Sequence, residues 1–362
     1  MTAFGTFFLP GPTEVRHEVL AAMTRPMIAH RGAEFEALFG ELQQGLRAVF
    51  RTARPVYIAP CSATGMMEAA VRCAPQGRIL ALVNGAFADR FAQVARACGR
   101  EVTVLDAAWG SAHGLDAVEA ELARAPYAAM TVVHSETSTG VLSDVRALAA
   151  LAHAHGAMIL VDSVTGVAGA PLETDAWGLD FVLTGSQKAL AVPPGLALAV
   201  ATEAFVERAA STPNRGLYFD LVEYEQFAKK NQTPNTPALS LLYALQEQLR
   251  HIMAEGIEAR WVRHAAMLQM VEHWAHGLHA RGIDVDFLAP PGARSPTVST
   301  LTAPAGMKGG DIVKRVAALG FVIGGGYGRL RDTTFRIGHM GDHTPDGLAR
   351  CLDACTQALA PS

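Results

Sequence analysis

The chain has 362 residues, of which 50% are hydrophobic and 18% charged, and its formal net charge is −4. This length predicts one large and one smaller compact unit, and the absence of a basic stripe argues against nucleic acid as the main partner. No apolar run is long enough to span a bilayer, and residues 1–20 lack the pattern of a secretory signal, so we expect a cytoplasmic protein without a membrane partner.

Short apolar runs alternate with segments of helical periodicity through the first two-thirds of the chain. Buried strands separated by helices are typical of a mostly parallel sheet that is covered on both faces. The sequence therefore predicts an α/β fold whose large domain has a seven-stranded sheet. The strands are expected at residues 56–59, 79–83, 102–105, 128–133, 158–161, 181–184 and 196–201, with helices at 65–73, 86–98, 115–123 and 144–155 between them.

The pattern changes after Thr236. Two long helical stretches are followed by a terminal region of mixed strands and helices, which predicts a second, smaller α+β domain. We place the large domain at residues 21–259 and the small one at 260–362, joined by the N-terminal residues 1–20. The long helices are expected at 238–254 and 257–280, the strands at 298–301 and 333–337, and the later helices at 311–319 and 345–359.

The cysteines form neither CxxC pairs nor a dense framework. Two of them lie one helical turn apart, but two ligands without a nearby histidine make a poor zinc site. We therefore expect reduced thiols and no metal site. The five cysteines are Cys61, Cys73, Cys98, Cys351 and Cys355.

The stretch "LTGSQKALAVPPG" contains one lysine, Lys188, in an otherwise uncharged sequence. Most lysines pack the stem on the surface and keep the ammonium group in water. Lys188 instead follows a strand end and a Gly-Ser turn, where the ligands of open α/β sheets collect. Because a desolvated lysine loses its proton more easily, Lys188 is a candidate nucleophile for Schiff-base formation.

Asp162 ends the apolar strand of "ILVDSVTG", 26 residues before Lys188. A carboxylate at this position either caps the next helix or forms a salt bridge to the protonated nitrogen of a pyridoxal ring. Taken alone, the residue leaves both interpretations open.

Other strand-end segments carry groups that suit the same ligand. In "APCSATGMMEAA", the turn before a helix presents backbone N–H groups to an anion, although an ordinary helix cap needs the same residues. Phe87 in "VNGAFADRF" either stacks on a flat ligand or belongs to the core. The loop "TVVHSETSTGVL" is rich in hydroxyl groups and holds His134, Glu136 and Thr137.

Arg336 lies in the apolar strand of "TTFRIGHMG". A buried guanidinium needs an anion, and a substrate carboxylate offers bidentate geometry. A phosphate cradle, a stacking ring, a pyridinium partner, a Schiff-base lysine and a carboxylate clamp together describe a site for pyridoxal 5′-phosphate.

The sequence resembles the class V aminotransferases of fold type I, close to the alanine–glyoxylate, serine–glyoxylate and serine–pyruvate enzymes. The resemblance covers nearly the whole chain, with its segments in the family's order and spacing. It implies a pyridoxal-phosphate-dependent transaminase that moves an amino group from alanine or serine to glyoxylate or pyruvate. The matching segments are "LPGPTEV", "SATGMMEAAV", "VNGAFADRF", "HSETSTGVL", "VDSVTG", "GSQKAL", "TPALSLLYAL" and "FRIGHMG".

The resemblance also implies a role for each matching residue. Lys188 would form the Schiff base and move the proton, Asp162 would hold the pyridine nitrogen, and Arg336 would take the substrate α-carboxylate. Thr236 would reach the phosphate from the neighbouring subunit, which implies a homodimer with shared active sites. The remaining cofactor contacts are Ser62, Ala63, Thr64 and Gln187 at the phosphate, Phe87 above the ring, Val164 beneath it and Thr137 near the phenolic oxygen; Gly11 and Arg31 are further substrate-binding candidates.

One departure from the family leaves the substrate open: Thr233 stands where alanine–glyoxylate enzymes often have Tyr. Phe87 stands where the family often has Trp, so stacking on the ring is expected to survive without the indole N–H. His30 and Arg31 either bind a substrate or form a solvated helix start. A phosphoserine aminotransferase is therefore the alternative within the same class.

Two other functions use the same fold. A cysteine desulfurase would need a reactive cysteine on a mobile loop over the cofactor. A non-enzymatic cofactor-binding protein would not need Arg336. The glycine run at 324–328 precedes a strand rather than a helix, so we expect a flexible loop near the substrate and no nucleotide site.

Overall fold

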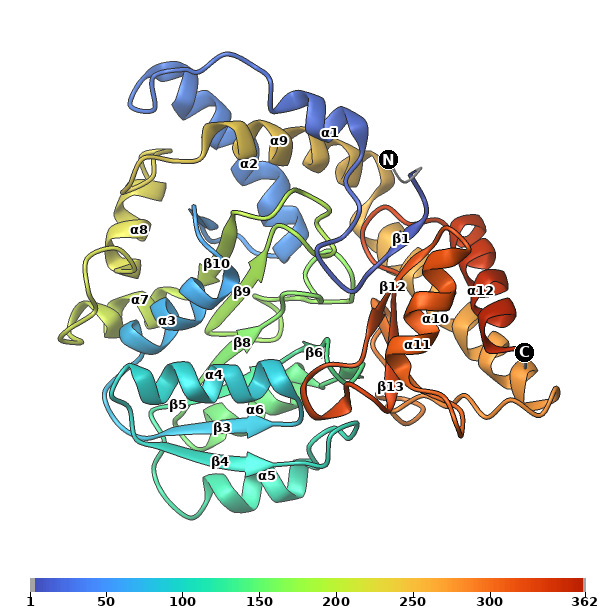
Figure 1. Ribbon diagram of the computed structural model, residues 1–362. Helices are drawn as coiled ribbons and strands as arrows, with labels where there is room; N and C mark the ends of the chain where they lie inside the picture. The colour runs from blue at the N-terminus through green and yellow to red at the C-terminus, as the bar shows by residue number, and fades with distance from the viewer. Residues whose placement is uncertain (1–3, 361–362) are drawn as a thin grey trace.

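A seven-stranded sheet forms the centre of the larger part of the molecule in the computed structural model, which describes residues 4–360 (Figure 1). The strand order is β2-β10-β9-β8-β5-β3-β4, in which β10 pairs antiparallel with both neighbours and the other pairs are parallel. The predicted α/β fold with a mostly parallel sheet is confirmed. The strands are β2 Tyr57–Ala59, β3 Ile79–Val83, β4 Val102–Asp106, β5 Ala129–Val133, β8 Met158–Asp162, β9 Phe181–Gly185 and β10 Ala197–Ala201.

Helices cover both faces of this sheet (Figure 1). Across the sheet, the connection from β3 to β4 runs toward the β4 edge. The connections from β4 to β5 and from β5 to β8 run the opposite way, toward the β2 edge. Because parallel crossovers are right-handed, this reversal puts α4 on one face and α5 and α6 on the opposite face. The covering helices are α3 Ala63–Cys73, α4 Ala86–Ala97, α5 Leu115–Leu122 and α6 Val145–Ala154.

A second helical layer surrounds the large sheet. Its longest members include α2, whose buried residues recur every three or four positions; the sequence prediction omitted this helix although that spacing indicates one. In the part of the chain that the structure describes, no helix combines the length and apolar composition that crossing a bilayer requires. The layer comprises α1 His17–Ala22, α2 Ala33–Phe50, α7 Glu203–Ala210, α8 Leu221–Ala228 and α9 Leu239–Glu255. The next helix, α10 Ile257–His279, contributes Trp261 to the large core and Met267, Val271 and Leu278 to the core of the smaller sheet.

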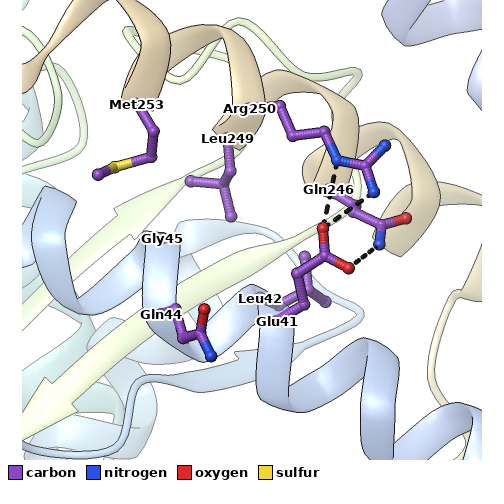
Figure 2. A pocket seen from close by; sticks show the side chains of 8 residues that line it. All are labelled: Glu41, Leu42, Gln44, Gly45, Gln246, Leu249, Arg250 and Met253. Carbon is purple, nitrogen blue, oxygen red and sulfur yellow. Dashed lines mark hydrogen bonds and ion pairs between the residues drawn. The ribbon is translucent and has the colours of Figure 1, made fainter.

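Helices α2 and α9 pack closely and enclose a surface cavity of about 230 Å³ (Figure 2). A Cβ added to Gly45 would lie 3.1 Å from the Cβ of Leu249, so only glycine allows this approach without a shift. Glu41 accepts hydrogen bonds from Gln246 and Arg250 at the rim. None of the predicted site residues lines this cavity.

The C-terminal part of the chain and the N-terminal strand β1 form a smaller sheet, with four strands in the order β1-β12-β13-β11 among residues 4–360. A separate hydrophobic core lies around it, whereas Val19 and Trp261 pack into the core of the large sheet. The domain boundaries at residues 20 and 260 stay predictions. The elements are β1 Phe7–Phe8, β11 Val298–Thr302, β12 Val322–Gly325, β13 Thr334–Gly338, α11 Gly309–Ala318 and α12 Pro345–Leu359.

The glycine run at 324–328 differs from the prediction of a flexible loop. Gly324 and Gly325 lie in β12 and pair with Arg336 and Phe335 of β13. A Cβ on Gly324 would lie 2.7 Å from Pro10, so close packing rather than mobility accounts for this glycine. After β12 the chain forms a short 3-10 turn at Gly328–Leu330.

The carboxyl ends of five strands meet at one edge of the large sheet. Strands β3, β5, β8 and β9 run parallel, and β2 runs with them because both β2 and β9 are antiparallel to β10. The direction of the crossovers reverses between β3 and β5, and ligands of open α/β sheets bind at such a switch point. All five strand-end segments singled out in the large domain therefore lie at this edge.

A buried ion pair connects the two cores next to this edge. Arg260 of α10 is fully buried and donates to Asp342 Oδ1 at 2.9 Å and to the carbonyl oxygen of Ala189 at 2.8 Å. Asp342, which follows β13, also accepts a bond from Arg16 Nε at 2.8 Å. Burial opposes the ionisation of Asp342, but Arg260 and Arg16 outweigh it and lower its pKa.

Replacing Arg260 with methionine will destabilise the cofactor-free protein by about 3–5 kcal/mol, because the buried carboxylate of Asp342 loses its main partner. Urea unfolding monitored by tryptophan fluorescence measures this loss. The matched control is Arg124→Met: Arg124 is 76% exposed in its ion pair with Glu121, so the loss should be at most about 1 kcal/mol. Equal losses in both variants would contradict the assigned role of Arg260.

Candidate active site

A cavity of about 150 Å³ opens at the carboxyl edge of the large sheet. It brings together nine of the ten residues predicted to bind the cofactor; Thr236 is not among its lining residues. The lining also includes side chains that sequence reasoning missed. The predicted residues are Ser62, Ala63, Thr64, Phe87, Thr137, Asp162, Val164, Gln187 and Lys188, and the additional ones are Met67, Arg90, Val133 and Ser135.

A sequence signal existed for three of the missed residues. Val133 and Ser135 lie on either side of His134 at the end of β5. Successive side chains of an extended segment point to opposite sides, so both line the cavity while His134 does not. Arg90 follows Phe87 by three positions in α4, which puts both on one face of the helix.

Lys188 lies directly beneath the N-terminal segment of the chain. Its Nζ donates to the carbonyl oxygen of Pro10 at 2.7 Å, and Thr13 donates its hydroxyl to the carbonyl oxygen of Lys188 at 2.9 Å. Gly11 has a φ of +127°, which favours glycine, and a Cβ there would lie 2.2 Å from Nζ of Lys188. Gly11 thus contacts the lysine directly, which sequence reasoning did not derive.

The pKa of Lys188 is lowered to about 8, mainly by burial and next by the nearby guanidinium of Arg336. The carboxylates of Asp162 and Glu136 act in the opposite direction but are weaker. At neutral to mildly alkaline pH, a substantial fraction of this amine is therefore neutral. A neutral amine is the form that attacks a carbonyl group.

Asp162 is the last residue of β8 and is 2% exposed. Its Oδ1 accepts a hydrogen bond from the backbone N–H of Val164 at 2.9 Å, and burial raises its pKa to about 7. A carboxylate so desolvated favours a cationic partner. The alternative that it caps a helix is not supported, because the next α-helix of the chain, α7, begins at Glu203 and is capped by Thr202.

The N-terminus of α3 faces the cavity through Ser62, Ala63 and Thr64. The N-cap residue Ser62 makes no side-chain cap hydrogen bond, so the first turn offers its N–H groups and the positive end of the helix dipole to an anion. The side chain of Gln187 lies beside this turn in the same lining. A Cβ on Gly185 would lie 2.6 Å from Gln187 Oε1, so this glycine makes room for the amide.

A buried carboxylate from another loop holds the start of α4. Glu136 is 0% exposed and accepts hydrogen bonds from the backbone N–H groups of Phe87 at 3.1 Å and Ala88 at 3.0 Å. Burial raises the pKa of Glu136, which the bonds from these amides and from Ser138 oppose. The N-cap residue, Gly85, has no side chain, so Glu136 supplies the cap and thereby fixes Phe87 against the cavity.

Arg336 projects from β13 of the smaller sheet toward the large one. Its Nε donates to the carbonyl oxygen of Gly325 at 2.8 Å, and its Nη1 donates to that of Thr137 at 3.1 Å. These two bonds fix the guanidinium beside the cavity, and burial lowers its pKa to about 10. The fold therefore brings a cation next to Lys188, where a substrate carboxylate would be attracted.

Four predicted residues are not among those that line this cavity. Gly11 and Arg336 lie beside it, next to Lys188 and Thr137. Thr236 and Arg31 belong to other segments. Thr236 is exposed on the segment that precedes α9. Arg31 precedes α2 and donates to the carbonyl oxygens of Thr233 at 2.6 Å and Pro234 at 3.1 Å. Within one chain, Arg31 therefore anchors the segment of Thr236 and does not line the pocket.

Comparison with known proteins gives the family. The sequence profile described as "Aminotransferase class-V" matches residues 11–297. The chain belongs to the class V aminotransferases. It is a transaminase of the α/β fold type I, and the enzymes of this family depend on pyridoxal 5′-phosphate.

Relatives match over nearly the full length of the chain. A serine–glyoxylate aminotransferase of Methylorubrum extorquens is 32% identical over 92% of this chain and 86% of its own. The small subunit of a soluble hydrogenase of Synechococcus is 34% identical over 97% of this chain and 92% of its own. The crystal structure of an alanine–glyoxylate aminotransferase from Nostoc superposes with a TM-score of 0.90 at 29% identity, covering 98% of this chain and 95% of that one.

The cavity of this class V aminotransferase fits the cofactor of its family. The uncapped turn of α3 would hold the phosphate, Phe87 and Val164 would enclose the ring, and the buried carboxylate of Asp162 would face the pyridine nitrogen. Lys188 would supply the amine. The cofactor, when bound, supplies the electron sink for reactions at an amino acid Cα.

The cysteines do not offer the reactive thiolate of a desulfurase. Burial raises the pKa of Cys61, which adjoins the α3 turn, to about 11. Cys351 and Cys355 are buried in α12, within the core of the smaller sheet. All five cysteines are free thiols.

In the cofactor-free protein, Lys188 will react with a small amine-selective reagent with a midpoint near pH 8. The neutral amine is the reactive form, so labelling rises as pH increases through the lowered pKa. Asp162→Asn will move the midpoint to lower pH, because Asp162 stabilises the ammonium form. Peptide mass spectrometry measures the labelling, with exposed Lys314 in the same digest as the reference; a Lys188 midpoint near 10.5 would contradict the assigned burial.

Proposed function

We propose that this class V aminotransferase moves an amino group from alanine or serine to glyoxylate or pyruvate. Lys188 is the central observation behind this proposal. Its buried amine shares a cavity with the carboxylate of Asp162, and Arg336 bonds to Thr137 of the same lining. With the cofactor bound, Lys188 would supply the amine that holds it and would carry the transferred proton at its Nζ. Asp162 would hold the protonated pyridine nitrogen, and Arg336 would orient the substrate through its α-carboxylate.

The small-amino-acid assignment has two supports. Two of the three proteins compared above are a serine–glyoxylate and an alanine–glyoxylate aminotransferase. The rival substrate, phosphoserine, would need a free cation for its phosphate group. Arg31, the candidate for that role, is not among the residues that line the cavity of its own chain.

The position of Thr236 supports a homodimer with shared active sites. Thr236 is exposed and lies outside the cavity of its own chain, as expected for a residue that reaches the phosphate of a neighbouring subunit. Arg31 binds the same segment and would hold it in place for that contact. The cytoplasmic location stays a prediction from the sequence.

A donor and acceptor panel tests the proposal. We expect alanine or serine with glyoxylate or pyruvate to give the highest kcat/KM among alanine, serine, phosphoserine and aspartate, each paired with glyoxylate, pyruvate and 2-oxoglutarate. Lys188→Ala should lower kcat by roughly 10²–10⁴-fold or more, since both the nucleophile and the proton carrier are lost. Lys314→Ala, at an exposed lysine, is the control. A phosphoserine preference that Arg31→Ala abolishes would contradict the proposal.

Mixed dimers test the shared site. A dimer of one Lys188→Ala chain and one Thr236→Ala chain contains one site with both residues intact if the sites are shared. It should therefore retain cofactor at one site with wild-type affinity, whereas the Thr236→Ala homodimer loses cofactor more readily. Two different affinity tags isolate the mixed dimer, and absorbance measures cofactor retention during dialysis. Mixed dimers without any site of wild-type affinity would count against sharing.

A further inference from the structure

An aromatic side chain that follows a strand of the smaller sheet lies between Arg336 and Phe87, a residue of the cavity lining. Tyr327 follows β12 and reaches the N-terminal half of α4, where Figure 1 shows the two segments side by side. Its ring stacks on Phe87 with centroids 5.4 Å apart and an interplanar angle of 27°. The guanidinium carbon of Arg336 lies 5.6 Å from the centre of the same ring. A donor whose carboxylate is held by Arg336 is therefore within reach of Tyr327.

Tyr327 also accepts a hydrogen bond from a second arginine of this region, Arg90. Arg90, which lines the cavity, donates from Nη2 to the hydroxyl oxygen of Tyr327 at 3.2 Å, and its guanidinium lies 5.3 Å from the centre of the Phe87 ring. Among residues 4–360, Arg90 forms no ion pair with a carboxylate. A neutral hydroxyl thus takes the position at which a second anionic group would otherwise bind.

The loop that carries Tyr327 is closely packed. A Cβ on Gly326 would lie 2.0 Å from the carbonyl oxygen of Leu330, which restricts the backbone on one side of the tyrosine. On the other side, the guanidinium of Arg329 lies 4.0 Å from the centre of the Trp109 ring. These contacts hold the tyrosine against Phe87, so moving it aside would disturb the loop.

We propose that Tyr327 is a specificity-determining residue that excludes acidic amino donors. Its ring fills the space between Phe87 and Arg336, and its hydroxyl keeps Arg90 from binding a second carboxylate. The pocket therefore accepts alanine or serine and discriminates against aspartate. The proposal concerns the site described under the proposed function and rests on it for the identity of the donors.

Removing the ring and hydroxyl of Tyr327 should allow the distal carboxylate of aspartate to bind where the wild type excludes it. In Tyr327→Ala the space beside Arg336 opens and the guanidinium of Arg90 becomes available to a distal carboxylate. The ratio of kcat/KM for aspartate to that for alanine, with glyoxylate as acceptor, should rise roughly tenfold or more, as one charge-assisted hydrogen bond allows. The double variant Tyr327→Ala/Arg90→Ala should lose that gain.

Arg329→Ala is the matched control. It removes a different side-chain contact between this loop and the large domain, the one with Trp109, and leaves the contacts of Tyr327 with Phe87, Arg90 and Arg336 in place. Its aspartate-to-alanine ratio should stay at the wild-type value. If this ratio rises equally in Arg329→Ala, the effect comes from loosening the loop, and the role of Tyr327 is overturned. The role is also overturned if the ratio does not rise in an active Tyr327→Ala variant. A wild-type preference for aspartate that Tyr327→Ala abolishes would overturn it as well.

A binding measurement separates this inference from the proposed reaction. Isothermal titration with succinate and propionate compares a dicarboxylate with a monocarboxylate of similar size, without turnover. Tyr327→Ala should bind succinate roughly tenfold more tightly relative to propionate than the wild type does, and the double variant should not. If the wild type transfers no amino group but this shift is present, the proposed substrates fail and the role of Tyr327 stands. If the shift is missing, the role of Tyr327 fails whatever the reaction.

Discussion

The desolvation of one amine is the constraint on which the site depends. Lys188 lies under the segment that contains Pro10 and Gly11, where little water can solvate an ammonium group. Burial and Arg336 lower its pKa, and the opposing carboxylate of Asp162 is too weakly coupled to restore it. The same burial raises the pKa of Asp162 to about 7. One dry environment thus prepares a neutral nucleophile and a carboxylate that favours a cationic ring.

The second requirement is that the smaller sheet stays fixed against the large one. Arg336 can serve the cavity only if β13 keeps its position relative to β5 and β9. The buried pair of Arg260 and Asp342 supplies this connection, and its bond to the carbonyl oxygen of Ala189 ties it to the residue after Lys188. The stacked rings of Phe87 and Tyr327 form another contact between the two parts. The position of Arg336, the proposed substrate carboxylate site, and the stability of the protein therefore depend on the same junction.

Much of the fold followed from local sequence pattern. Each predicted strand and helix is present, with ends that differ by one or two residues, because buried strands and amphipathic helices are defined by the periodicity of their own side chains. The glycine run at 324–328 was wrongly expected to be a flexible loop, since its first members belong to β12. Glycine signals both mobility and close packing, and only the neighbours, here Pro10 and Arg336, decide between them.

The sequence by itself determined which chemical groups are available: an isolated lysine, a strand-end carboxylate and a helix start suited to an anion. These three groups can be found in the sequence because each is defined by its residue type and by its position at the end of a strand. Only the tertiary structure decided how these groups act on one another. Glu136 holds the helix of Phe87, Tyr327 occupies Arg90, and Arg336 comes within range of Lys188. Such effects arise from burial and from contacts between segments far apart in the chain, and neither is encoded in local spacing.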